Sequence, residues 1–337
     1  MGDRVIVAPT GEVARVVHIS GGKYIEIPIS SLRVDSVTNF DLYLRTQEDL
    51  PPVLFREKHL PFTQDVLGRL AELNHSHMWV RDDEHDVYQQ YVEKHLESIL
   101  GDSGVPITAK SKVLYSSATG LMRRIFENPG SGELVTRSQE LAGKMTKFLA
   151  SENRAFHHLM GLVSYDYYTY THSVNVYVYS VCLAQKMGLT DPALLREFGE
   201  GLLLHDIGKS RIDPEIVNSK GRLTDDQWKH MRLHPVHGYD ILMHEKKLGP
   251  MALDVVRHHH EKLNGNGYPD GLQGKKISEW VRISTICDVF DALTTKRSYK
   301  EAMQTYKALT IMRDEMSHEI DQNIFRVFVG MLASPDK

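Results

Sequence analysis

The chain has 337 residues, of which 41% are hydrophobic and 25% charged, and this balance excludes an intrinsically disordered, collagen-like or fibrous protein. That length suits two globular domains better than one core. Its 40 basic and 44 acidic side chains give a net charge of −4, so no global positive field is available to hold a nucleic acid polymer or an anionic membrane.

Hydropathy and cysteine usage favour a protein of the reducing cytoplasm. No stretch approaches the roughly 18 consecutive apolar residues of a membrane span, and the first residues do not resemble a signal peptide. The two cysteines, Cys182 and Cys287, are far apart, so neither a disulfide framework nor a Cys-x-x-Cys zinc site is expected. We therefore expect a cytoplasmic protein with no membrane association.

The N-terminal region contains short β-prone runs separated by Gly, Pro and polar turns. A helix over 63–73, a strand over 77–81 and a helix over 83–100 follow them. These elements predict an α+β module over residues 1–104, which we interpret as a sensory or regulatory domain. The β-prone runs are 4–8, 12–19, 23–29, 40–45 and 52–57.

Beyond a turn at 101–104, helical periodicity dominates and predicts a helical linker over 105–139 and an all-α domain over 140–337. Residues 168–180 are ambiguous, because they alternate and are rich in β-branched and aromatic residues, so that both a strand and a helix over 165–187 are open. Only the pattern of metal ligands that includes His172 favours the helix. The expected helices are 110–127, 132–151, 192–204, 225–232, 235–244, 250–258, 277–293 and 299–316.

Histidine is concentrated in one part of the chain. Eleven of the 18 histidines lie between His157 and His260, where uniform scatter would place about six. Several stand beside carboxylates, and five imidazoles with two carboxylates are too many for one closed zinc site. Mixed His and carboxylate ligands without thiolate favour Fe or Mn, and less specifically Zn, and a carboxylate can bridge two ions. The pattern suggests a binuclear hydrolytic centre. Its residues are His172, His205, Asp206, His234, His259, His260 and Asp288.

Four motifs in order resemble the HD-GYP family of cyclic di-GMP phosphodiesterases, a branch of the HD phosphohydrolases. They are HDIGK at 205–209, HPVHG at 234–238, HHEKLNGNGYP at 259–269 and DVFDALTTKRSYK at 288–300. The resemblance covers roughly residues 140 to 335 and implies an all-α HD-type helical bundle. It also implies hydrolysis of cyclic di-GMP to pGpG, with GMP as a further product left open.

The resemblance implies two divalent metal ions, Fe or Mn. One ion would be held by His172, His205, Asp206 and Asp288, and the other by His234, His259 and His260, with Asp206 shared. His258 matches no ligand of the family, and we expect it to face solvent or to surround the ligands. We expect Glu261 to orient a histidine ligand.

The same resemblance implies the substrate contacts. Lys209, beside the catalytic Asp206, would neutralise phosphate charge in the transition state, and Tyr268 would line the substrate site. Arg297 and Lys300 would bind phosphate oxygens. Two departures lie on the substrate-side loops, where Ser298 replaces the usual Pro, and Ser-Lys-Gly at 219–221 replaces Lys-Pro-Gly.

One further departure concerns the number of ions. Some family members carry a Glu four residues before the first ligand His, where it helps to hold a third ion, whereas this chain has Tyr168 there. A neutral phenol is a poor ligand for divalent ions, so two ions are expected rather than three.

Other functions stay open. A complete ligand set with Lys209 favours an enzyme, whereas the altered loops allow a non-catalytic cyclic di-GMP receptor. Hydrolysis of another nucleotide is disfavoured by the Gly-Tyr-Pro loop. A homodimer formed through the linker helices is a further hypothesis.

Overall fold

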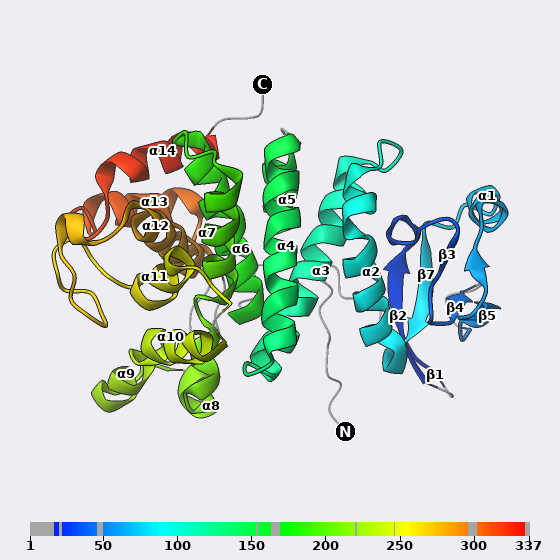
Figure 1. Cartoon of the computed structure of the whole chain (residues 1–337), viewed down its shortest axis with the longest axis horizontal. Coiled ribbons are helices and arrows are strands. Elements are labelled where there is room, and N and C mark those ends of the chain that lie inside the picture. The colour runs from blue at the N-terminus through cyan, green and yellow to red at the C-terminus, as the bar shows by residue number, and fades with distance from the viewer. Residues whose placement is uncertain are drawn as a thin grey trace. The chain divides into compact units, whose positions relative to one another are not determined.

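The computed structural model of the chain (Figure 1) describes residues 17–19, 22–45, 50–152, 154–162, 169–219, 221–245, 247–295 and 302–333. It divides into two compact units, Met1–Gly120 and Leu121–Lys337, and the boundary falls inside helix α3 (Ile107–Glu127). An α+β unit precedes a helical one, which confirms the predicted fold class. The narrower domain limits at residues 104 and 139 stay predictions.

The first unit contains an antiparallel sheet with the strand order β1-β2-β7-β4-β5. Ile25 pairs with Val80 and Ile27 with Met78, and these four side chains are buried. The predicted run at 4–8 lies outside the described residues. The strands are β1 (Val17–Ile19), β2 (Gly22–Pro28), β4 (Leu42–Leu44), β5 (Val53–Arg56) and β7 (His77–Arg81), while β3 (Ser36–Val37) pairs separately with β6 (Pro61–Phe62).

Two helices follow the predicted pattern in this unit. Helix α1 (Gln64–Glu72) begins after Thr63, whose hydroxyl accepts a hydrogen bond from the Val66 N–H. Helix α2 (His85–Gly101) places Tyr88 and Tyr91 edge-on against buried Phe40, with ring centroids 5.5 Å apart in both pairs. The tyrosines fix the helix against the apolar core of the unit.

In the second unit, α7 packs against α4, α6 and α11 (Figure 1). Asp191 caps α7 by accepting two backbone N–H groups, and Pro192 occupies its first turn, where a missing N–H costs nothing. From Phe198 to Leu204 every residue is buried. The helices are α4 (Gly132–Ser151), α5 (Ala155–Met160), α6 (Thr169–Lys186), α7 (Pro192–Leu204), α8 (Pro214–Val217), α9 (Asp225–Met231), α10 (His234–Glu245), α11 (Pro250–His258), α12 (Glu279–Thr294), α13 (Thr305–Asp314) and α14 (Gln322–Ala333).

The ambiguous segment is helical. It forms α6, in which every residue from Thr171 to Ala184 is buried. A helix buried all round has no polar face, so the 3.6-residue signal of an amphipathic helix is absent from its sequence. The strand alternative is therefore wrong for the described residues of this segment.

The C-terminal helices differ from the sequence prediction. Gln304 is extended and precedes α13, so that helix begins at Thr305 and is shorter than the predicted 299–316. Helix α14 (Gln322–Ala333) was not predicted, although it buries Ile324, Phe325 and Phe328. In the described part of the second unit, the sequence analysis therefore missed α14 as well as the short helices α5 and α8.

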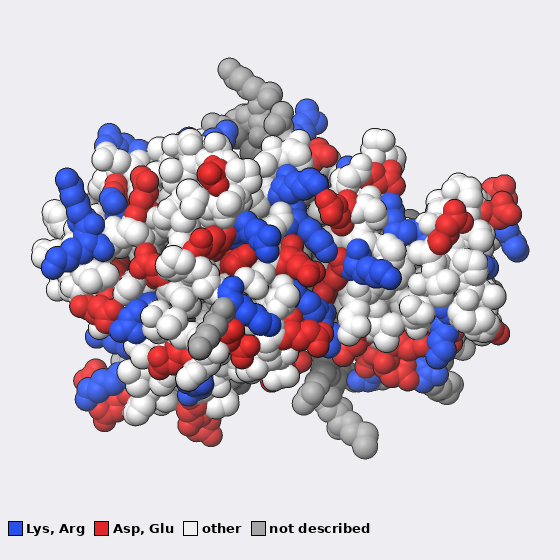
Figure 2. Space-filling view, in the orientation of Figure 1, with Lys and Arg blue, Asp and Glu red and all other residues white. Residues whose placement is uncertain are grey.

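The surface carries charges of both signs. Figure 2 shows Lys and Arg side chains interspersed with Asp and Glu over the visible face. Among the described residues, no helix is both long and apolar enough to cross a membrane.

Candidate metal centre

The centre is built where α7 ends. His205 terminates the helix and Asp206 precedes a 3-10 turn, Ile207–Arg211, that packs against α10. Gly208 permits this close approach, because a β-carbon there would overlap the backbone carbonyl of His234. The approach brings His234 Nε2 to 3.2 Å from Asp206 Oδ1.

The structure brings together the seven residues that the sequence analysis selected as ligands. Two groups have ligand atoms within 4.8 Å of one another, and both groups contain Asp206. The first group is His172, His205 and Asp206, and the second is Asp206, His234, His259 and His260.

Asp288 lies between the two groups. Its Oδ1 is 2.9 Å from His172 Nε2, and its Oδ2 is 3.5 Å from His260 Nδ1. Helix α12 supplies this carboxylate and α6 supplies His172, and these two helices pack together. Asp288 is therefore within reach of an ion held by the first group.

Hydrogen bonds on the outer side of the imidazoles fix their tautomers. Nδ1 of His205 lies 2.7 Å from the Leu202 carbonyl oxygen, and Nδ1 of His234 lies 2.8 Å from that of Met231. A carbonyl oxygen only accepts, so Nδ1 carries the proton and the Nε2 lone pair points into the centre.

His259 follows the same rule through the Val256 carbonyl, 3.0 Å from its Nδ1. The Nε2 atoms of His234 and His259 lie 3.2 Å apart. Two unprotonated imidazole nitrogens this close repel each other, and a cation bound between them would stabilise the arrangement.

Asp291 orients the first histidine, and the sequence analysis missed it. Asp291 Oδ2 is 2.7 Å from His172 Nδ1, and its Oδ1 accepts a hydrogen bond of 3.0 Å from Asn175 Nδ2. The available signal was the three-residue spacing from Asp288 on one helix, which places both carboxylates on neighbouring positions of one face.

Burial shifts the protonation equilibria of the centre. Burial lowers the pKa of His205, lowers that of His259 well below its usual range, and lowers that of His260 to about 3. Burial alone would raise the pKa of Asp206, but the ammonium group of Lys209 beside it holds that pKa well below its usual range. These three imidazoles are therefore neutral, and Asp206 is ionised, near neutral pH.

This donor set fits divalent metal ions. Asp206 Oδ1 is buried and has no hydrogen-bond donor among the described residues, although it faces imidazole nitrogens that lack a proton. An ionised oxygen left in that state is costly unless a cation completes the site. The clusters are thus able to hold metal.

Lys209 contacts the same carboxylate from the other side. Its Nζ donates to Asp206 Oδ2 at 2.5 Å, and its side chain is 14% exposed. It reaches the centre from the 3-10 turn that follows Asp206. The ammonium group is therefore close to the shared carboxylate, and its side chain keeps a small exposed fraction.

The Gly-Tyr-Pro loop places an aromatic ring beside the centre. The Tyr268 ring lies 4.8 Å from that of His260, with an interplanar angle of 31°. Burial, with the carboxylates of Asp288 and Asp206, raises the pKa of Tyr268, so its hydroxyl stays protonated.

Glu261 anchors this loop. We had expected it to orient a histidine ligand, but within the described residues its hydrogen bonds go to backbone N–H groups of the loop. Its buried carboxylate accepts hydrogen bonds from the N–H groups of Asp270 at 2.8 Å and Leu272 at 2.9 Å. His258 lies between Asp254 and Asp270, at 2.6 and 2.9 Å, and so supports the same loop from outside the centre.

Three residues selected from sequence lie outside the described residues. They are Arg297 and Lys300, the expected phosphate contacts, and Tyr168, which bears on the number of ions. Their roles stay predictions.

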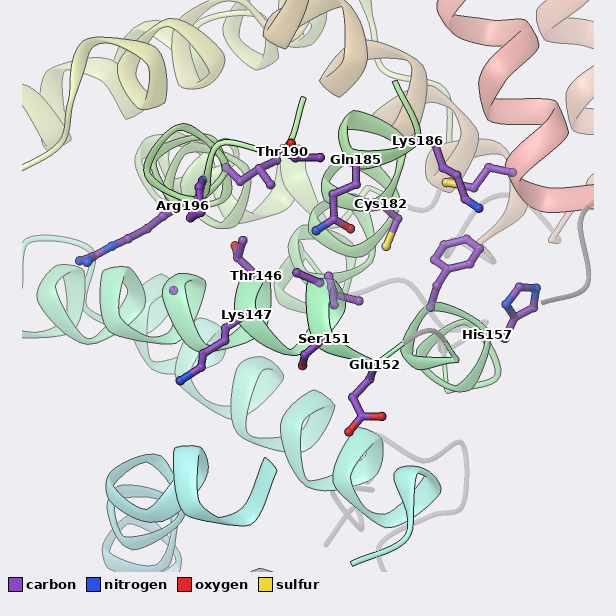
Figure 3. Close-up of a pocket in the computed structure, with 17 residues that line it drawn as sticks. Thr146, Lys147, Ser151, Glu152, His157, Cys182, Gln185, Lys186, Thr190 and Arg196 are labelled. Carbon is purple, nitrogen blue, oxygen red and sulfur yellow. The ribbon is translucent and has the colours of Figure 1, made fainter. Parts of the chain in front are cut away.

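A cavity of about 900 Å³ in the helical unit is separate from the centre (Figure 3). Its lining includes Cys182 and Gln185 near the end of α6 and Leu195 near the start of α7. His172 and His205 stand at the opposite ends of those helices. None of the seven candidate ligands lines the cavity.

Comparisons with known proteins agree with the motifs. The family model of the HD domain matches residues 132–324, more than half of the chain. A cyclic di-GMP phosphodiesterase of Pseudomonas aeruginosa is 35% identical over 219 residues, which cover 64% of this chain and 52% of that protein. The 3'3'-cGAMP-specific phosphodiesterase 3 of Vibrio cholerae is 37% identical over 160 residues, 47% of this chain and 34% of that protein.

The chain thus spans about half the length of the Pseudomonas relative. Among solved structures, a HDG"Y"P protein from Bdellovibrio bacteriovorus matches with a TM-score of 0.65 and 23% identity, covering 92% of this chain and all of that one. This likeness supports the fold. By its family match and its motifs, the chain belongs to the HD domain family as a member of the HD-GYP branch.

Proposed function

We propose that the chain hydrolyses cyclic di-GMP to linear pGpG, with GMP left open as a further product, at a centre of two divalent ions, Fe or Mn. The observation that carries this proposal is the position of Asp206, which belongs to both clusters and has one buried oxygen that no donor in the described ranges reaches. The phosphodiesterase names of the relatives support the reaction class.

The proposed ligand sets follow the two clusters. His172, His205 and Asp288 serve the first ion, and His234 with the pair His259 and His260 serves the second, with Asp206 between them. Two such ions would neutralise phosphate charge and lower the pKa of an attacking water. The protein fixes the ligands by the outward hydrogen bonds of its imidazoles, so little reorganisation is needed when ions bind.

Lys209 has the role of a phosphate partner. Its contact with Asp206 places a positive charge at the edge of the centre, where negative charge grows on the phosphate in the transition state. Tyr268 lines the substrate site, and Arg297 with Lys300 binds phosphate oxygens.

The remaining proposals concern the whole chain. The α+β unit regulates the helical unit, by analogy with related architectures. The protein acts in the cytoplasm, with the cyclic dinucleotide as its ligand, and a homodimer forms through the linker helices.

One assay tests the reaction against its rival. The full chain is loaded anaerobically with Fe(II) or Mn(II), incubated with cyclic di-GMP or 3'3'-cGAMP, and its products are separated by chromatography. We expect pGpG and GMP from cyclic di-GMP, and no product after chelation of the metal. Tight binding without product under metal-replete conditions would establish a receptor, and turnover of 3'3'-cGAMP alone would reassign the substrate.

A further inference from the structure

An exposed arginine lies against the tyrosine of the Gly-Tyr-Pro loop. The guanidinium carbon of Arg232 is 5.4 Å from the centroid of the Tyr268 ring. That ring in turn lies 4.8 Å from the ring of His260. A short chain of contacts therefore connects a surface cation to the candidate metal centre.

Both partners of this contact are fixed by the backbone around them. Arg232 directly follows the last residue of α9, and α10 begins at His234, so a candidate ligand lies two residues after the arginine. Tyr268 belongs to the loop that Glu261 anchors through two backbone N–H groups. The contact between Arg232 and Tyr268 is thus held beside the centre by two separate segments.

Two other cations near the Gly-Tyr-Pro loop are paired with carboxylates. Arg257 pairs with Asp270 at 2.8 Å, and Lys262 pairs with Glu319 at 2.8 Å. Within the ranges that the structure describes, no carboxylate pairs with Arg232. An arginine held over an aromatic ring, with no carboxylate partner in these ranges, has N–H groups that can donate to a planar acceptor.

We propose that Arg232 binds the substrate, donating two hydrogen bonds to an acceptor edge of the cyclic dinucleotide that lies beyond the scissile phosphate. This inference rests on the proposed function and extends it. Two groups of cyclic di-GMP have the required chemistry, the second phosphate and the O6/N7 edge of guanine. Stacking on Tyr268 orders the guanidinium before the substrate arrives, which reduces the entropy lost on binding.

The test compares Arg232→Ala and Arg232→Lys with Lys229→Ala, in the metal-loaded full chain. Lys229 is an exposed lysine of α9 that pairs with Asp226, so its removal is a matched loss of charge. Steady-state kinetics are measured with cyclic di-GMP and with bis(p-nitrophenyl) phosphate, which has neither a guanine nor a second phosphate. Metal content is determined for every variant.

We expect Arg232→Ala to raise KM for cyclic di-GMP about tenfold to a hundredfold with little change in kcat. Its loss of kcat/KM on cyclic di-GMP should exceed its loss on the small diester at least about tenfold. The kcat/KM of Arg232→Lys for cyclic di-GMP should lie between the values of the parent and of Arg232→Ala. Lysine keeps the positive charge but lacks the planar guanidinium that donates two parallel hydrogen bonds. Lys229→Ala should behave as the parent.

Inhibition by cyclic di-AMP separates the two acceptors. If the arginine contacts a phosphate, Arg232→Ala weakens both cyclic dinucleotides equally, and if it contacts guanine, it weakens only cyclic di-GMP. An unchanged KM, an equal loss on both substrates, or an equal effect of Lys229→Ala would overturn the assignment. A parent that hydrolyses the small diester but neither binds nor cleaves cyclic di-GMP would contradict the proposed function, and the role of Arg232 with it.

Discussion

Individual side chains around Asp206 show how the centre is prepared for metal. The outer nitrogens of His205, His234 and His259 are held by carbonyl oxygens, whereas His172 is held by a buried carboxylate, Asp291. A carboxylate behind a histidine raises the basicity of its ligand nitrogen. The first candidate site therefore depends on a residue outside the seven selected from sequence.

Asp291→Asn tests that dependence. The amide keeps the size of the side chain and loses its charge, so we expect metal affinity at the first site to fall about tenfold to a hundredfold. Competition with a chromogenic chelator measures it, and His234 and its partners should still hold about one ion. Parental affinity for both ions would contradict the orienting role of Asp291.

Lys209→Ala tests the phosphate partner. Metal content should stay at the parental value, because Lys209 donates to Asp206 and does not offer a lone pair to a cation. Turnover should fall about 10²- to 10³-fold, the effect of removing one charge-stabilising donor. Elemental analysis and product release are measured on the same preparation, and undiminished turnover would remove Lys209 from the mechanism.

Helices and loops were predictable to different degrees. The capped, amphipathic helices α1, α4 and α7 agree with the sequence prediction, because their ends carry Thr63, Ser131 and Asp191 as capping residues. Helix α6 has no polar face, so periodicity alone could not distinguish it from a strand. The function of Glu261 was not predictable either, since its partners are backbone groups nine and eleven residues away.

Close helix packing around α7 gives a matched pair of glycine substitutions. A β-carbon on Gly201 would lie 2.7 Å from the Ala252 carbonyl oxygen of α11, whereas one on Gly143 of α4 would meet Arg196 Cδ at 3.6 Å, an ordinary contact. Gly201→Ala should therefore lower the free energy of unfolding by about 1–3 kcal/mol. Gly143→Ala should leave it unchanged or raise it by up to about 1 kcal/mol. Urea titration measures both, and equal effects would contradict the packing.

On the scale of the molecule, the sequence pointed to the candidate ligands because six of the seven lie in four short motifs, and His172 is the exception. It did not show how segments from α6, α7, α10, α11 and α12 converge on Asp206, since that requires the packing of the helices. The ligand set was predictable, but the orienting contact of Asp291 and the stack of Arg232 on Tyr268 were not, because both join segments distant in sequence.

Metal binding should stabilise the helical unit. Ions that bind the folded state contribute about 2.7 kcal/mol when their free concentration is a hundred times Kd. We expect chelation to lower the Tm of the transition that belongs to residues 121–337 and to leave that of the first unit unchanged. Calorimetry with and without chelator measures this, and Asp206→Ala should lack the shift. An equal shift in that variant would place the stabilising ions elsewhere.

The most direct measurement is anomalous diffraction at the metal edge from crystals of the metal-loaded chain. We predict two peaks, one on each side of Asp206 and about 3.5–4 Å apart. Crystals of Asp206→Ala should lose most of this density. A single peak, peaks remote from Asp206, or a third peak ligated near Tyr168 would contradict a two-ion centre bridged by this carboxylate.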